Sequence, residues 1–141
     1  MVPPLTTEVV ISNRRVSSAY LEQMTLVFLN GLLDLSAQDV MHKRDMILKY
    51  TADSDLNFAK KINTYFAESE DKYKQFDLST YFTVKNMEVD EANNEVIAHG
   101  TLTSRYGKQG FESVQVSYRL TYEFGGGYLR LKEFNKIVQR D

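Results

Sequence analysis

The sequence predicts an α+β domain in which three N-terminal helices pack on one face of an antiparallel sheet of about four strands. The period of the apolar residues is near 3.6 from residue 19 to about residue 75, and near 2 from residue 79 onward. Helix-start signals recur in the first part, whereas Gly- and Asn-containing turns divide the second. Helices followed by a meander of strands are typical of the α+β class.

The composition favours one ordinary domain with its own hydrophobic core. The 141 residues are 43% apolar and 26% charged, close to globular averages. The net charge is −2 and the basic runs are short and separate, which argues against a general nucleic-acid-binding protein. Because there is no Cys, disulfides and Cys-ligated metals are excluded. No apolar stretch approaches the roughly 18 residues of a membrane span.

Residues 1–16 show no sustained periodicity and are predicted to form a tail or linker, in which residues 8–11 could add a short extended piece. The first helix is expected to begin near Ala19, since Ser17 and Ser18 can cap its N-terminus. One face carries residues at helical spacing: Tyr20, Met24, Val27, Phe28, Gly31, Leu32 and Leu35. A second apolar stripe, displaced by well over a right angle, consists of Leu26, Leu29 and Leu33.

The second stripe has two interpretations. In the first, the helix is buried on two sides, by the sheet and by a neighbouring helix. In the second, the stripe is reserved for another protein chain. Leu26, Leu29 and Leu33 are therefore the candidate protein–protein interface.

Two more helices are expected before the sheet. Ser36 and Asp39 match the capping box, so a second helix is predicted from there to about Tyr50. Its inward residues are Val40, Ile47 and Leu48. Asp53 or Ser54 is expected to start a third helix. Its inner face carries Phe58, Ala59, Ile62, Tyr65, Phe66, Ser69 and Tyr73.

Strands are predicted at residues 79–89, 95–104, 114–124 and 128–138. Every even residue from Val114 to Phe124 is apolar and every odd one is polar, which specifies an antiparallel sheet with one buried face. The alternation of the last strand falters between Leu131 and Phe134, as at a β-bulge.

Metal-binding and catalytic patterns are weak. His42 and His99 lack a second ligand at helical or strand spacing, and His99 is predicted to be a half-exposed strand residue. Asp53 and Asp55 could form an acidic pair, but their position favours helix capping. Residues 107–110 lack the phosphate-loop spacing and are expected to form a hairpin loop. No Ser stands in Gly-x-Ser-x-Gly, so no catalytic, cofactor or metal residue is predicted.

Two segments resemble the soluble domain of TraE conjugative-transfer proteins. Residues 20–26 (Tyr-Leu-Glu-Gln-Met-Thr-Leu) through 30–32 (Asn-Gly-Leu) resemble its first helix. Residues 126–134 (Gly-Gly-Tyr-Leu-Arg-Leu-Lys-Glu-Phe) resemble its terminal strand. The resemblance spans roughly residues 17–138 and rests on order, length and pattern. VirB-branch relatives carry an Asn-Pro-x-Gly turn where this sequence has three glycines, so the TraE branch fits better.

The resemblance implies a nuclear-transport-factor-like fold, in which a curved antiparallel sheet holds the helices in its concavity. It also implies a bitopic inner-membrane protein with one membrane helix and a periplasmic domain. We therefore expect a fragment in which residues 1–16 are a juxtamembrane tail or linker, residues 17–138 are the single periplasmic domain and residues 139–141 are a C-terminal tail.

The function implied by the resemblance is that of a non-catalytic assembly component of a conjugative type IV secretion system. It would bind itself and other components of the system, without direct contact with nucleic acid. The alternative is a small enzyme or ligand-binding protein with a pocket between sheet and helices, lined by an acid or His and Tyr donors. A deep pocket with a buried carboxylate favours the alternative, whereas a shallow groove or apolar patch favours assembly.

Overall fold

The computed structural model describes residues 11–12, 15–51, 56–125 and 127–137. Its elements are β1 (Ile11–Ser12), β2 (Arg15–Val16), α1 (Ser18–Leu33), β3 (Leu35–Ser36), α2 (Val40–Leu48), α3 (Leu56–Phe76), β4 (Leu78–Asp90), β5 (Glu95–Tyr106), β6 (Phe111–Gly125) and β7 (Tyr128–Ile137). β1 and β2 pair with each other, and the other five strands form one antiparallel sheet in the order β3-β4-β5-β6-β7.

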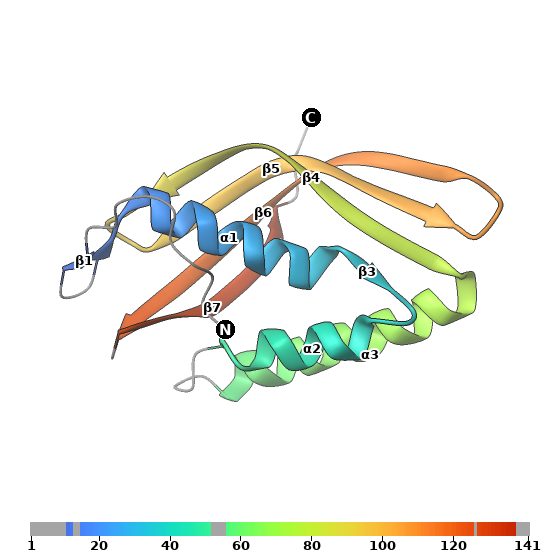
Figure 1. Ribbon diagram of the computed structural model, residues 1–141, viewed down its shortest axis with the longest axis horizontal. Helices are drawn as coiled ribbons and strands as arrows, with labels where there is room; N and C mark the ends of the chain where they lie inside the picture. Colours follow the sequence, from blue (N-terminus) through green and yellow to red (C-terminus); the bar gives the residue numbers. More distant parts are fainter. Residues whose placement is uncertain (1–10, 13–14, 52–55, 126, 138–141) are drawn as a thin grey trace.

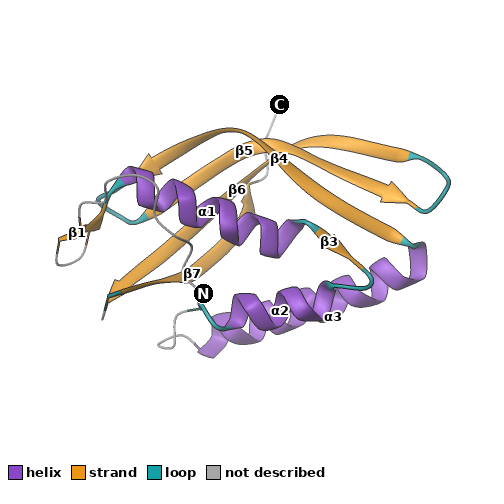
Figure 2. Ribbon diagram, viewed as in Figure 1, coloured by secondary structure: helices purple, strands orange, loops and turns teal. Residues whose placement is uncertain are grey.

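The sheet curls around the helices, all of which lie on its concave side (Figures 1 and 2). α1 crosses the concave face against β4 and β5, while α2 and α3 lie side by side further from the arch of the sheet. This confirms the predicted α+β arrangement of three helices on one face of an antiparallel sheet. None of the helices in the described ranges is both long and apolar enough to cross a membrane.

The fifth strand, β3, was not predicted. Its two residues pair with Thr80 and Ser79 of β4. The sequence pattern places Leu35 on the face of the first helix, but α1 ends at Leu33 and Leu35 is buried in β3. A two-residue strand is too short to show the alternation by which strands are recognised.

The starts of the helices follow their capping residues only in part. The Ser17 hydroxyl accepts a hydrogen bond from the Tyr20 N–H at 3.3 Å, which confirms the predicted cap of α1. The Ser36 N–H donates to the Asp39 carboxylate at 2.8 Å, as in a capping box. That contact closes a turn, however, and α2 begins only at Val40. The start signal predicted for α3 lies outside the described residues.

The C-terminal end of α1 is anchored by donors from α2, α3 and β4, and Lys43 of α2 donates to the Asn30 carbonyl at 3.2 Å. A helix leaves its last carbonyl groups without intrahelical partners. Tyr65 of α3 donates its hydroxyl to the Leu32 carbonyl at 2.5 Å, and Thr80 of β4 donates to the Leu33 carbonyl at 2.6 Å. Because the Thr80 proton is used there, the Tyr73 hydroxyl, 2.7 Å away, donates to Thr80. These contacts hold α1, α3 and β4 together.

Two β-bulges interrupt the long strands. On β4, Lys85 stands opposite the junction between Gly100 and His99. On β7, Lys132 is the extra residue opposite β6, where the alternation falters, so the predicted bulge is confirmed. A bulge bends its strand and increases the local twist, which suits a curled sheet.

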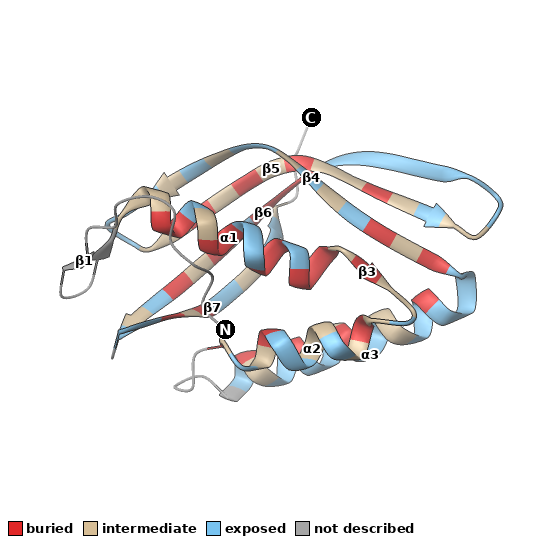
Figure 3. Ribbon diagram, in the orientation of Figure 1, coloured by how far each residue is buried: buried red, intermediate tan, exposed pale blue. Residues whose placement is uncertain are grey.

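The core lies between the concave face and the helices (Figure 3). The alternating β6 residues that were predicted to face inward are buried in this core: Val116, Tyr118, Leu120 and Tyr122. Val114 follows the same alternation but is 49% exposed, so its predicted burial is wrong. The β5–β6 hairpin extends beyond the helices, and the beginning of β6 therefore has no helix to cover it.

Candidate functional site

The three residues of the candidate interface differ in their exposure. Leu29 and Leu33 are only 3% and 4% exposed and belong to the core, whereas Leu26 is 51% exposed. Val27, which the pattern placed on the inner face, is also exposed. The structure thus presents Leu26 and Val27 together on the outer side of α1. An interface at Leu26 stays a prediction.

The burial of Leu29 and Leu33 follows from the position of α1 between two layers. The sheet lies on one side of the helix and α2 on another. At Gly31 the two helices approach so closely that a Cβ atom would lie 2.7 Å from Cδ1 of Ile47. The second stripe is therefore largely the packing surface for neighbouring elements, in line with the interpretation of two-sided burial.

A groove separates α3 from the last strand. Phe58, Lys61, Ile62 and Tyr65 of α3 line one wall, Tyr118 lies at its floor, and residues 132–136 of β7 form the other wall. We call it the α3–β7 groove, and its volume is about 470 Å³. No local pattern in the sequence indicates this groove, because its walls come from a helix and from the last strand.

Aromatic rings form the base of the α3–β7 groove. The rings of Tyr118 and Phe134 are stacked, with centroids 5.2 Å apart and an interplanar angle of 10°. Tyr65 meets Phe134 edge-on at 6.0 Å. Burial raises the pKa of Tyr65, and burial together with the nearby Tyr73 raises the pKa of Tyr118 to about 12. Both phenols are therefore neutral at physiological pH.

The rim of the α3–β7 groove is positively charged. Lys61, Lys132 and Lys136 are exposed there, against one exposed acid, Glu133. Among the described residues, none of these three lysines takes part in an ion pair. Their charge remains available to attract carboxylates from solution.

The alternative of an enzyme with a cone-shaped pocket requires an acid or a His deep in the cavity. Glu133 lies exposed at the rim of the α3–β7 groove, and Glu68, beside an adjoining hollow, is exposed as well. His99 lies on the opposite, convex face of the sheet. Over the described ranges, no group of three or more potential metal ligands was found either. Neither of these exposed carboxylates is the buried acid that the enzyme alternative requires.

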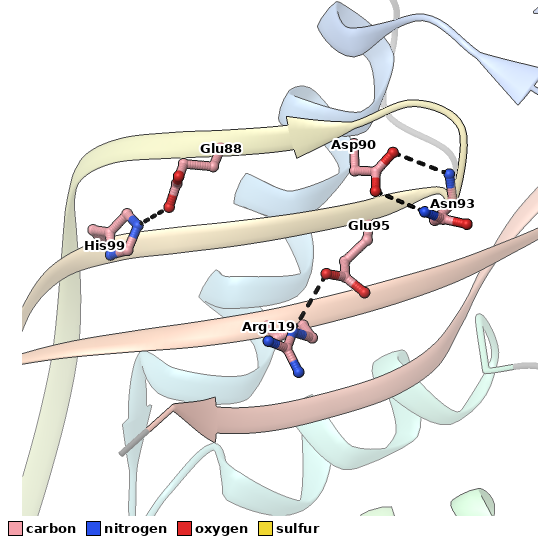
Figure 4. A network of polar contacts seen from close by, with 6 residues as sticks. All are labelled: Glu88, Asp90, Asn93, Glu95, His99 and Arg119. Atoms are coloured by element: carbon pink, nitrogen blue, oxygen red, sulfur yellow. Dashed lines mark hydrogen bonds and ion pairs between the residues drawn. The ribbon is translucent and has the colours of Figure 1, made fainter. Parts of the chain in front are cut away.

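A polar network crosses the convex face (Figure 4). His99 Nε2 lies 2.5 Å from the Glu88 carboxylate, and its Nδ1 lies 2.6 Å from the Ser117 hydroxyl. Glu, His and Ser are the residue types of a hydrolase triad. Ser117, however, is only 2% exposed, so its hydroxyl is not presented to a substrate. The contacts tie β4, β5 and β6 together, and His99 is a part-exposed strand residue, as predicted.

The neighbouring pairs in the network are structural. Arg119 of β6 meets Glu95 of β5 at 3.3 Å. In the turn between β4 and β5, both carboxylate oxygens of Asp90 accept hydrogen bonds from Asn93. Such a contact, from an Asp side chain to a residue further along the turn, is common in hairpins.

Comparison with known proteins gives a family and a fold. The family model described as "TraE protein" matches residues 1–136. None of the curated proteins matches the chain.

Two solved structures share the fold. The VirB8 protein of Agrobacterium tumefaciens is 10% identical, with a TM-score of 0.61 over 86% of this chain and 94% of that chain. CagV, a VirB8 homolog of the type IV secretion system from Helicobacter pylori strain 26695, is 11% identical, with a TM-score of 0.55 over 85% of this chain and 98% of that chain. The nuclear-transport-factor-like fold implied by the resemblance is confirmed.

Proposed function

Because this chain belongs to the TraE family, we propose that it is a non-catalytic assembly component of the inner-membrane complex of a conjugative type IV secretion system. The family match over residues 1–136 carries the proposal. The fold shared with two VirB8 proteins supports it. A groove whose nearby carboxylates are exposed supports binding rather than catalysis.

The domain would act through contacts with itself and with other components of the secretion system. Leu26 and Val27 are the apolar residues that α1 offers to such a partner. Leu29 and Leu33 would contribute indirectly, by fixing the position of α1. The net charge of −2 disfavours direct contact with DNA, so DNA transfer would depend on the assembled complex.

In this proposal the full-length protein is anchored in the bacterial inner membrane through an N-terminal helix. Residues 17–138 would form the domain on the periplasmic side, residues 1–16 the connection to the membrane and residues 139–141 a short C-terminal tail. This arrangement is the one that the family resemblance implies.

The test is a mating assay with the conjugative element that carries the gene. Removal of the gene should abolish transfer, and the full-length wild-type protein should restore it. Leu26→Asp should restore it poorly, whereas Leu26→Met, which keeps an apolar side chain, should restore it fully. Transfer that persists without the gene would contradict the proposed function.

A further inference from the structure

We propose that the α3–β7 groove is a docking site for an extended, acidic segment of a partner protein. Apolar side chains of the segment would enter the groove, and its carboxylates would meet the lysines of the rim. The inference rests on the proposed function, in that the domain acts through protein contacts. It adds a surface distinct from the exposed residues of α1 and a chemistry for the partner.

The first argument is the edge of the sheet. β7 is the last strand in the order β3-β4-β5-β6-β7, and a strand edge is a template for pairing with another extended chain. This edge already accepts one such contact, because the Leu131 N–H donates to the Tyr50 carbonyl at 2.7 Å. Thr51 forms a parallel bridge with Leu131 at the same place. Within the described residues, no bridge continues along the edge beyond Leu131.

The second argument is the distribution of charge and apolar surface. Lys61 lies on the α3 wall, and Lys132 and Lys136 lie on the β7 wall, so cations face a bound segment from both sides. From residue 132 to residue 136 an extended strand rises about 13 Å, the length of about four peptide residues. An occupant of this length needs alternating carboxylate and apolar side chains, because successive side chains of a strand point to opposite faces.

A single-stranded nucleic acid fits the groove less well. Proteins that bind single strands stack the bases on accessible aromatic rings. Here Tyr118 is only 5% exposed and stacks on Phe134, so the ring is already occupied by the core. A peptide needs only apolar contact and an edge for hydrogen bonds, both of which the groove offers.

The test uses the purified chain and a fluorescein-labelled decapeptide that alternates Glu with Leu. Fluorescence anisotropy should show saturable binding that weakens as salt is added, and a peptide with Lys in place of Glu should not bind. Lys61→Glu and Lys136→Glu should each weaken binding about tenfold. Lys60→Glu is the matched control and should leave binding unchanged, because Lys60 is exposed on the same helix but does not line the groove.

Other outcomes would overturn the inference. The first is an absence of saturable binding up to about 1 mM peptide. The second is that Lys60→Glu and Lys61→Glu weaken peptide binding equally. The third is that an oligothymidine displaces the peptide and that its own binding is weakened by Lys61→Glu in the same way. Circular dichroism verifies that each variant is folded. If the peptide-binding test fails, the proposed function can still hold, because loss of DNA transfer on removal of the gene does not depend on this groove. The two tests therefore distinguish failure of the docking site from failure of the proposed function.

Discussion

The hydroxyl oxygens of Thr25 and Tyr122 lie 2.6 Å apart in the core, although 97 residues separate them in the sequence. Thr25 belongs to α1 and Tyr122 to β6, and both are buried. A buried hydroxyl is costly unless it finds a partner, and here each hydroxyl is the partner of the other. The pair therefore specifies how α1 sits in the concavity.

The effects of replacing the two partners of this pair should not be additive. Tyr122→Phe leaves the Thr25 hydroxyl buried without its partner, and a loss of about 1–3 kcal/mol in the free energy of unfolding is expected. The double variant Thr25→Val/Tyr122→Phe should lose less than the sum of the two single variants. Urea unfolding measures both, with Tyr81→Phe at an exposed position as the control. Strict additivity would contradict the coupling.

Alkaline pH should destabilise the domain through its buried tyrosines. Burial raises the pKa of Tyr118 to about 12 from the ordinary value of 10.0, and burial raises the pKa of Tyr65 and Tyr122 as well. Because the folded state binds these protons more tightly, their contribution to stability is complete below pH 10 and falls as the pH rises toward 12.

Unfolding in urea at a series of pH values measures this loss. Absorbance of the phenolate reports the same effect, since the native protein should ionise fewer of its nine tyrosines than the unfolded chain at a pH between 10 and 12. Coincident titration curves for the native and the unfolded protein would contradict the prediction.

Gly100 should tolerate no side chain. A Cβ atom there would lie 2.1 Å from the Thr83 carbonyl oxygen, which belongs to the backbone of β4. Gly100→Ala would force the two strands apart beside the Lys85 bulge, and a loss of about 3 kcal/mol or more in stability is expected. Gly125→Ala is the matched control, because its Cβ meets nothing within 4 Å. Thermal unfolding of both variants measures the difference.

A charged side chain should destabilise the domain strongly at Leu29 and hardly at all at Leu26. Leu29→Asp buries a carboxylate in the core and should prevent folding, with a loss above about 4 kcal/mol. Leu26→Asp should change stability by less than about 1 kcal/mol, since the residue is exposed.

Sedimentation across a range of concentrations then tests whether Leu26 contributes to self-association. If the wild type self-associates and folded Leu26→Asp does not, Leu26 contributes to the contact. Equal association of both would exclude it.

The sequence predicted the fold well because its elements are long and strongly periodic. The alternation of β6 and the irregularity at Lys132 were each visible within a dozen residues. The exposure of Leu26 was not predictable in the same way. Leu26 and Leu29 share an apolar stripe, and only the positions of the other helices and the sheet decide which of them is covered.

The α3–β7 groove lay beyond sequence reasoning for a related reason. Lys61 and Lys136 belong to separate amphipathic elements, and each is typical of a solvated face when considered alone. Their common role depends on the distance between a helix and a strand, which no local pattern encodes. The early end of α1 and the strand β3 were missed because local helical periodicity at Leu35 is overridden by pairing with β4.

The bulge at Lys85 has a consequence for how such domains diverge. Val84 and Met87 both pack on the core because one unpaired residue is inserted between them and resets the alternation. Deleting that residue would leave Val84, Met87 and Val89 on the core face, because Val84 and Asn86 already pair with the consecutive residues Gly100 and His99. What the deletion would remove is the local bend of β4. A variant that is one residue shorter at this point should therefore keep the same core residues but have a straighter β4. In this domain the extra residue shapes the curvature of the sheet and leaves the composition of the core unchanged.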